Sequence, residues 1–169
     1  MQDVPIPSKV LKKFEKLLKR ARETALSEPT AMTLSTVNNE GRPSSRTVLL
    51  KSFDEQGFVF YTNQESRKGE QLAAHPWASL CFYWDELHEQ ASVEGRVVPV
   101  SDEESDAYWV TRPRASQIGA WASLQSRPLQ SRAHLMARVA KYTVKFPGKI
   151  PRPPYWSGLR VIPARIEFW

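Results

Sequence analysis

Between residues 31 and 100 the sequence alternates short β-branched, apolar segments with short polar turns, and this pattern limits the fold more than any other feature. Five segments have strand character, and turn clusters such as "NNEGRP" and "SFDEQ" separate them. Short turns of this kind join antiparallel neighbours, so we predict an antiparallel sheet or barrel. The strands are expected in "AMTLSTV", "SSRTVLL", "GFVFYT", "ASLCFYW" and "EQASVEGRVVPV", and "LRVIPARIEFW" returns to strand character near the end.

Helices are expected around and between these strands. Apolar residues at helical spacing predict an N-terminal helix over about residues 8–26, with lysines and arginines on its solvated face. A short helix is expected over Ser66–Pro76, with the serine as N-cap and the proline as stop. Ser101 and Glu104 have capping-box spacing, which indicates another helix start. A further helix is expected over residues 130–146, and "PGKIPRPPYWSG" indicates an ordered proline-rich loop.

The bulk composition is that of an ordinary globular chain. With 169 residues, 41% of them hydrophobic, the sequence fits a single domain over residues 1–169. Its one cysteine, Cys81, cannot form an internal disulfide, which favours a reducing, cytoplasmic setting and predicts a buried thiol. The net charge of +6 suits nucleic acid, a membrane surface or small anions as partners, or reflects solubility alone. No apolar run approaches the roughly 20 residues of a membrane span.

Two adjacent cations, Arg67 and Lys68, stand at the expected start of the short helix, in "FYTNQESRKGE". Helix N-termini present free N–H groups and the positive end of the helix dipole, so cations there cost about 0.3–1 kcal/mol. A bound anion such as phosphate would offset that cost. The stretch therefore predicts either an anion site or two ordinary surface cations.

The segment richest in hydrogen-bond donors is "TRPRASQIGAWASLQS", Thr111–Ser126, which fits neither a plain amphipathic helix nor a plain strand. Its Arg112 and Arg114 carry planar guanidinium groups suited to phosphate or carboxylate. Tyr108 lies four residues before Arg112, so both can share a helix face. Tyr108, Arg112 and Ser116 together predict a phosphate clamp. The alternative is a polar linker packed by its tryptophan, and Arg114 has no assigned role.

Several common catalytic motifs are missing from the sequence. It has neither a P-loop nor a dinucleotide-binding glycine fingerprint, and no nucleophile elbow with a Ser-His-Asp set. The three histidines, His75, His88 and His134, lack metal-ligand spacing, so no metal site is expected. Phosphate-like sites without acid–base side chains indicate that a cofactor supplies the chemistry.

Five stretches occur in an order that resembles a known family: "RTVLLK", "FYTNQESRKGEQLAAHP", "RPRASQIGAWASLQS", "PRPPYWSGLRV" and "RIEFW". Together they closely resemble the pyridoxine (pyridoxamine) 5′-phosphate oxidase family, flavin enzymes of the split β-barrel type, over about Glu28–Trp169. The resemblance implies a mainly β fold with flanking helices, in an antiparallel, Greek-key-like split β-barrel. It also implies a homodimer that binds FMN at the subunit interface.

The resemblance implies site residues, carried over motif by motif. No side chain is expected to be catalytic, because the flavin takes the hydride. The implied reaction oxidises pyridoxine or pyridoxamine 5′-phosphate to pyridoxal 5′-phosphate with dioxygen, and it releases hydrogen peroxide. The substrate phosphate would be held by Lys51, Tyr108, Arg112 and Ser116. The FMN contacts would be Arg46, Lys51, Tyr61, Thr62, Arg67, Lys68, Gln90, Gln125, Ser126 and Trp169.

The sequence departs from the family pattern at its C-terminal end. Family members continue past "IEFW" with a segment resembling "RLHDR", which is absent after Trp169, and we expect that it was removed rather than lost naturally. Three other functions stay open: a related flavin oxidase with a phenazine-type substrate, a non-catalytic FMN- or pyridoxal-phosphate-binding protein, and a basic nucleic-acid-binding barrel. The last would interleave aromatic and basic residues on one sheet face, which the sequence does not clearly do. Neither nucleic acid nor a membrane is therefore expected as a partner.

Overall fold

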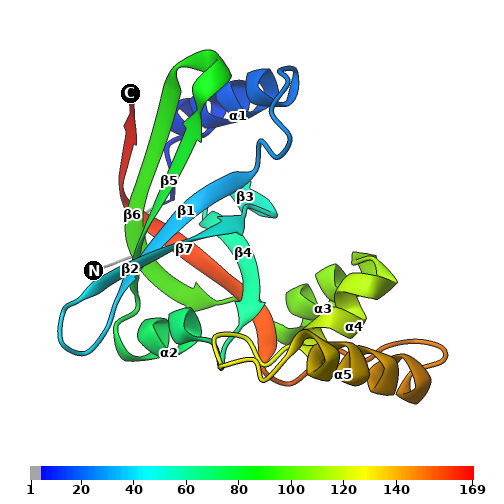
Figure 1. Ribbon diagram of the computed structural model, residues 1–169. Helices are drawn as coiled ribbons and strands as arrows, with labels where there is room; N and C mark the ends of the chain where they lie inside the picture. Colours follow the sequence, from blue (N-terminus) through cyan, green and yellow to red (C-terminus); the bar gives the residue numbers. More distant parts are fainter. Residues whose placement is uncertain (1–4) are drawn as a thin grey trace. The chain divides into compact units, whose positions relative to one another are not determined.

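The strands of the chain form one seven-stranded sheet, in the order β2-β1-β5-β6-β7-β4-β3 in the computed structural model (Figure 1). The structure describes residues 5–169. The pairs β1–β2, β1–β5, β3–β4, β5–β6 and β6–β7 are antiparallel. The predicted class, mainly β with flanking helices, is confirmed. The strands are β1 (Ala31–Val37), β2 (Pro43–Leu49), β3 (Ser52–Asp54), β4 (Gly57–Asn63), β5 (Trp77–Trp84), β6 (Glu89–Pro99) and β7 (Trp156–Phe168).

Five α-helices and one short 3₁₀ helix accompany the sheet within residues 5–169. The N-terminal helix ends earlier than the predicted residue 26, because the amides of Glu23 and Thr24 turn back onto carbonyls three residues before them. This tightening closes the last turn at Arg22. The helices are α1 (Ser8–Arg22), α2 (Arg67–Ala74), η1 (Asp85–Leu87), α3 (Asp102–Thr111), α4 (Arg114–Ala122) and α5 (Arg132–Lys145).

Two elements and one burial state differ from the sequence-based expectations. The segment "SFDEQ", expected as a turn, contains the three-residue strand β3, which pairs with β4 through Asp54 and Gly57. Helix α4 lies where neither helix nor strand was expected. It is only nine residues long and contains a glycine, so its apolar periodicity is short and weak. Cys81 is half-buried rather than buried, because it lies on the less covered face of β5.

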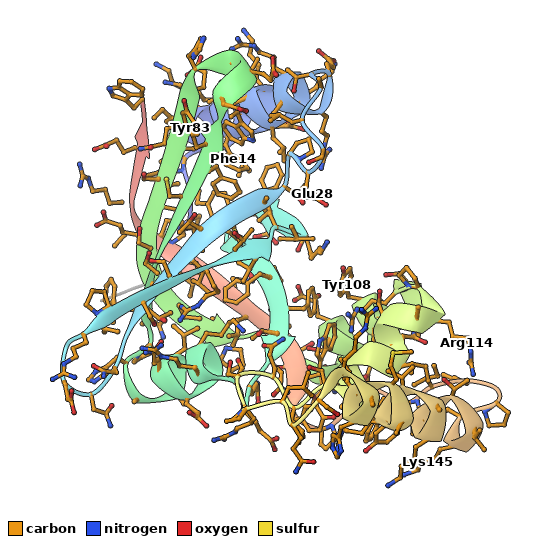
Figure 2. The ribbon with its side chains drawn as sticks, viewed as in Figure 1. Phe14, Glu28, Tyr83, Tyr108, Arg114 and Lys145 are labelled. Carbon is orange, nitrogen blue, oxygen red and sulfur yellow. The ribbon has the colours of Figure 1, made fainter. Side chains whose placement is uncertain are left out.

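By its contacts the chain divides into two compact units, a strand unit and a helical unit. The strand unit comprises residues 5–60, 71–99 and 159–169 of the described chain. Its core is aromatic and includes Phe14 from α1 (Figure 2). The ring of Phe14 meets those of Phe53, Phe58 and Phe82 edge-on, with centroids 4.9–5.1 Å apart. Edge-to-face pairs at this distance add to the hydrophobic gain from burial. Helix α1 is therefore an integral part of the strand unit's core.

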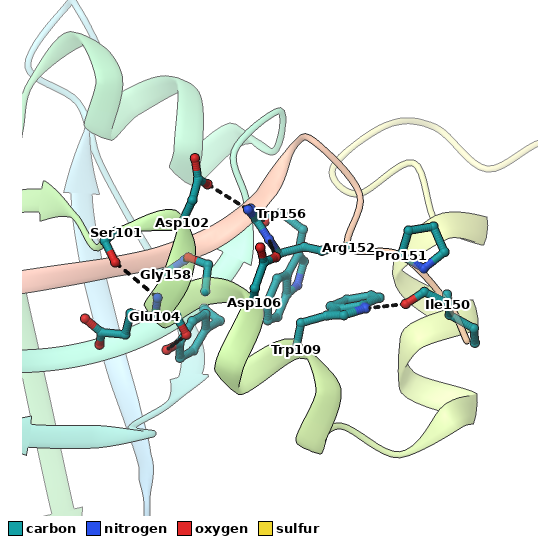
Figure 3. Close-up of polar contacts among 12 residues, drawn as sticks. Ser101, Asp102, Glu104, Asp106, Trp109, Ile150, Pro151, Arg152, Trp156 and Gly158 are labelled. Atoms are coloured by element: carbon teal, nitrogen blue, oxygen red, sulfur yellow. Dashed lines mark hydrogen bonds and ion pairs between the residues drawn. The ribbon is translucent and has the colours of Figure 1, made fainter. Parts of the chain in front are cut away.

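The helical unit comprises residues 61–70 and 100–158, and includes the end of β4, the start of β7 and helices α3 to α5. Its buried core consists of Trp109, Ile118, Ile150 and Trp156. The side chain of Arg152, only 14% exposed, connects the proline-rich loop to α3 through two ion pairs (Figure 3). Its guanidinium lies 2.7 Å from a carboxylate oxygen of Asp102 and 2.5 Å from one of Asp106. The capping box predicted at the start of α3 is confirmed in part, since Ser101 Oγ accepts from the Glu104 amide at 3.1 Å.

Candidate functional site

The corner between α3 and α4 presents the side chains of the predicted phosphate clamp. Helix α3 ends at Thr111, and Arg112 has an extended backbone because Pro113 follows it. The prediction that Tyr108 and Arg112 share a helix face is therefore wrong. Their side chains nevertheless meet at one ring: Arg112 Cζ lies 4.6 Å from the Trp156 centroid, and the Tyr108 ring stacks 6.2 Å from it.

An aromatic stack forms one wall of this corner. The rings of Tyr61 and Tyr108 stack with centroids 4.1 Å apart, and Tyr61 stacks on Trp156 at 5.2 Å. Tyr61 comes from the end of β4, Tyr108 from α3, and Trp156 from the start of β7. The sequence reasoning assigned Tyr61 to the flavin and Tyr108 to the substrate, and within the helical unit the two rings are direct neighbours.

Arg112 is a half-buried cation, and one of its buried nitrogens has no hydrogen-bond partner. Its guanidinium lies over two indole rings, 4.6 Å from Trp156 and 5.1 Å from Trp109. Its Nη1 is the one buried side-chain nitrogen or oxygen without a hydrogen-bond partner among residues 5–169. Burial lowers the pKa of the Arg112 guanidinium from its ordinary value, and Tyr108 partly offsets this effect. An unpaired buried donor costs stability, so the position suits an anionic acceptor that supplies the missing bond.

Ser116 lies in the first turn of α4, four residues after Arg112, and is exposed. The structure thus places three of the four predicted substrate residues on one corner of the helical unit. The fourth, Lys51, is exposed just after β2 in the strand unit.

The helical unit also carries six of the predicted flavin residues. Tyr61 and Thr62 end β4, and Thr62 is buried. Arg67 and Lys68 open α2 as predicted, and Ser66 caps it by accepting from the Gly69 amide at 3.5 Å. Lys68, 9% exposed, donates through Nζ to Gln125 Oε1 at 2.7 Å, so two predicted flavin contacts lie side by side. Ser126 has a positive φ of 65°, which is uncommon for a residue with a side chain.

The strand unit carries the other predicted flavin residues. Gln90 and Trp169 are paired by two backbone hydrogen bonds, of 2.6 and 2.9 Å, where β6 meets the end of β7. The Trp169 side chain is 75% exposed. Arg46 is half-buried on β2, where its guanidinium donates to Thr36 Oγ1 at 2.5 Å and to Ser44 Oγ at 2.7 Å.

Arg114, which had no assigned role in the sequence, has a structural one. Its guanidinium donates to the carbonyls of Phe146, the C-cap of α5, and of Gly148. Cations suit the C-terminal end of a helix, where free carbonyls and the negative end of the dipole lie. Arg114 therefore caps α5 and is not an anion-binding residue of the clamp.

Comparison with known proteins places the chain in a family. A family profile described as pyridoxamine 5′-phosphate oxidase matches residues 18–146. A protein of Myxococcus xanthus (strain DK1622), named pyridoxine/pyridoxamine 5′-phosphate oxidase, is 57% identical over 167 residues, which cover 98% of this chain and 81% of that protein. The chain belongs to the pyridoxamine 5′-phosphate oxidase family. The resemblance inferred from the sequence motifs is thereby confirmed.

Two solved structures of similar fold bear on this family member. The crystal structure of PhzG from Burkholderia lata 383, in complex with tetrahydrophenazine-1-carboxylic acid, matches with a TM-score of 0.90 and 35% identity, over 96% of this chain and 80% of that one. A pyridoxamine 5′-phosphate oxidase-related, FMN binding protein from Nostoc punctiforme PCC 73102 matches with a TM-score of 0.74 and 22% identity, over 93% and 81%. The split-barrel fold expected from the motifs is confirmed.

Sequence reasoning missed the residues that hold the clamp of this family member in place. Trp109 and Trp156 flank Arg112, and the Trp109 indole Nε1 is fixed by the Ile150 carbonyl at 2.8 Å (Figure 3). Gln117 is buried and donates to the Trp109 carbonyl at 2.8 Å, which braces the corner between α3 and α4. A tryptophan near an arginine in the sequence, such as Trp109 near Arg112, can signal such stacking. Trp156 on β7 is too far from Arg112 in the sequence to be recognised in this way.

Proposed function

We propose that the protein is an FMN-dependent oxidase that converts pyridoxine or pyridoxamine 5′-phosphate to pyridoxal 5′-phosphate, with dioxygen as electron acceptor and hydrogen peroxide as product. Membership of an oxidase family supports the reaction class. The observation that carries the substrate is Arg112 Nη1, a buried donor without a partner. A phosphate oxygen would supply the acceptor, and Tyr108 and Ser116 would add hydroxyl groups to the same phosphate. Lys51 is proposed as the fourth contact.

The donor set fits FMN on chemical grounds. The proposed contacts include cations of the kind that bind a phosphate: Arg46 and Lys51 in the strand unit, and Arg67 and Lys68 in the helical unit. Arg67 and Lys68 open α2, where free N–H groups also favour an anion. Tyr61, Thr62, Gln90, Gln125, Ser126 and Trp169 are the further proposed contacts.

The chain's own residues would bind the substrate, orient it and exclude water from it. Bound FMN would supply the two-electron redox chemistry that oxidises C4′ of the vitamer and reduces dioxygen to hydrogen peroxide; with pyridoxamine 5′-phosphate, water would be consumed and ammonia released. Arg112 would fix the phosphate arm of the substrate, which limits the positions that the neighbouring C4′ group can take. The stacked rings of Tyr61, Tyr108 and Trp156 give that corner an apolar wall, which strengthens the charge interaction.

We also propose a homodimer, with FMN at its interface. One face of β5 supports this: Trp77 is 49% exposed and Tyr83 59% exposed on the strand that also carries half-buried Cys81. Large aromatic side chains on one exposed sheet face are typical of a surface that a partner covers. A single cysteine fits a cytoplasmic location, which is part of the proposal. No helix within residues 5–169 is long and apolar enough to cross a membrane.

A second candidate function is oxidation of a phenazine precursor. The specific observation in its favour is the structural match to PhzG, which was crystallised with tetrahydrophenazine-1-carboxylic acid. That ligand has a carboxylate, which Arg112 could also bind. The hydroxyl groups of Tyr108 and Ser116 beside Arg112 favour the larger phosphate group, so we rank the vitamer phosphate first.

One experiment separates these functions. The protein is incubated with FMN and pyridoxine 5′-phosphate in air, and formation of the aldehyde is followed by its absorbance. We expect aldehyde and peroxide in equal amounts, and a yellow, dimeric protein on gel filtration. Flavin uptake without aldehyde would indicate a binding protein, and turnover of the phenazine precursor alone would support the second candidate. A protein that stays colourless with added FMN would overturn both oxidase functions.

A further inference from the structure

A hydrogen-bond network surrounds Arg46 in the strand unit. Its guanidinium donates through Nη1 to Thr36 Oγ1 at 2.5 Å and through Nη2 to Ser44 Oγ at 2.7 Å. Both hydroxyls in turn donate to Gln71 Oε1, at 2.6 Å from Thr36 and 2.9 Å from Ser44. Arg46 Nη2 also approaches Gln71 Oε1 directly, at 3.3 Å. The amide oxygen of Gln71 is therefore the common acceptor of the network.

The orientation of the Gln71 amide follows from the chemistry of its neighbours. Arginine has only donors, so the Gln71 atom that faces it must be the oxygen. With that choice each hydroxyl accepts once from Arg46 and donates once to Gln71, and no donor faces a donor. Thr36 and Gln71 are 2% and 5% exposed, so a mismatch here would cost a buried hydrogen bond.

Four uncharged oxygens accept hydrogen bonds from the Arg46 guanidinium. Besides the two hydroxyls and the amide oxygen, the guanidinium donates to the Leu34 carbonyl at 3.3 Å. Neutral acceptors orient a guanidinium without cancelling its charge, whereas a carboxylate in the same place would compete with an incoming anion. A buried glutamine thus holds the Arg46 guanidinium in place without adding a negative charge beside it.

We propose that Gln71 is a positioning residue that sets the preference for FMN over riboflavin by holding the Arg46 guanidinium toward the flavin phosphate. The inference rests on the proposed function, in which Arg46 contacts FMN. Gln71 itself touches Arg46 and the two hydroxyls and is given no contact with flavin. Its effect should therefore appear only with the ligand that has a phosphate.

The test compares two flavins on apoprotein by fluorescence titration. FMN and riboflavin differ only in the phosphate, so the ratio of their dissociation constants isolates phosphate recognition. Gln71→Glu keeps the acceptor oxygen and the shape of the side chain, and places a carboxylate against Arg46. We expect the dissociation constant for FMN to rise about 10- to 100-fold, the range for loss of a charge-assisted contact. The dissociation constant for riboflavin should change by less than about twofold.

A matched control adds the same charge elsewhere. Gln56 is exposed in the turn between β3 and β4, so Gln56→Glu should leave both flavin affinities unchanged. If Gln71→Glu does not fold, as judged by circular dichroism of the apoprotein, Thr36→Val and Thr36→Ser replace it. The first removes one hydroxyl of the network and should lower the FMN preference, and the second retains the hydroxyl and should preserve it.

The outcomes separate the inference from its premise. A wild-type protein that binds FMN and riboflavin equally would refute phosphate anchoring by Arg46, and with it this part of the proposed function. A wild-type preference for FMN that survives in Gln71→Glu would overturn the positioning role alone. A parallel loss of riboflavin affinity would show that the residue supports the fold and not the phosphate contact.

Discussion

Replacing Arg112 by methionine should make the apoprotein no less stable while it weakens substrate binding. The unpaired Nη1 costs about 1–3 kcal/mol in the absence of a ligand. The stacking of the guanidinium over Trp156 at 4.6 Å and Trp109 at 5.1 Å returns about 0.5–2 kcal/mol. Methionine keeps an unbranched apolar chain against the two indoles. The two effects oppose each other, so we expect the free energy of unfolding to stay unchanged or to rise by about 1–2 kcal/mol.

Binding of the phosphorylated substrate should fall sharply in the same variant. A hydrogen bond between a guanidinium and a phosphate contributes about 1.5–3 kcal/mol, so the dissociation constant for pyridoxine 5′-phosphate should rise about 10- to 100-fold. The affinity for FMN should change by less than about twofold, because Arg112 is not among the proposed flavin contacts. Urea unfolding of the apoprotein measures the change in stability. Anaerobic titration calorimetry measures the affinity for pyridoxine 5′-phosphate without turnover.

Two results would refute this reasoning about Arg112. Equal loss of FMN and pyridoxine phosphate affinity would show that the clamp is assigned to the wrong ligand. Destabilisation of the apoprotein by more than about 2 kcal/mol would show that the guanidinium supports the fold, as a fully bonded arginine does. Arg132→Met is the control, since it removes the same charge from an exposed position at the start of α5.

Three further substitutions have definite expected outcomes. Arg67→Ala should raise the dissociation constant of FMN about 10-fold, measured by fluorescence titration, and an unchanged value would count against an anion site at the start of α2. Gly57→Ala should lower the free energy of unfolding by more than about 2 kcal/mol, because φ is +142° and the new Cβ would lie 2.2 Å from the Val161 carbonyl oxygen; a smaller loss in urea would mean that this close approach relaxes. Arg152→Leu should cost about 1–2 kcal/mol in the same assay, since exposed carboxylates make its two ion pairs modest, and an unchanged midpoint would show that the loop is held by packing alone.

The strand pattern could be predicted from the sequence because β-branched runs and turn clusters act locally. The segment "AMTLSTV" matches β1 residue for residue, and the predicted ends of β5 and β6 are within one residue. Helix α4 could not be predicted in this way. Its buried face, formed by Gln117, Ile118 and Ala122, is defined by packing against the rest of the helical unit, and Arg114 and Ser116 conceal the pattern. Tertiary context overrides local propensity in such short helices.

The candidate site was predictable by residue type more than by geometry. Motif resemblance placed Tyr108, Arg112 and Ser116 together, and the structure brings them to one corner. Their spacing of four residues predicts that Tyr108 and Arg112 share a helix face, which Pro113 prevents. The two side chains instead meet at the ring of Trp156, 44 positions after Arg112 in the chain. Local spacing cannot reveal a contact that only the start of β7 supplies.

What surrounds each arginine separates those proposed to bind anions from those that stabilise the fold. Arg152 is bonded to two carboxylates, which offset its charge. Arg114 is bonded to the Phe146 carbonyl at the C-cap of α5 and to the Gly148 carbonyl just beyond it, where the helix dipole favours a cation. Arg46 is oriented by hydroxyl, amide and carbonyl oxygens, and Arg112 by two indole faces. Uncharged neighbours fix the position of a guanidinium and leave its charge to act on a ligand. Arg46 and Arg112 are therefore prepared for phosphate, whereas the charge of Arg114, two residues from Arg112 in the sequence, already acts on the negative end of the α5 dipole.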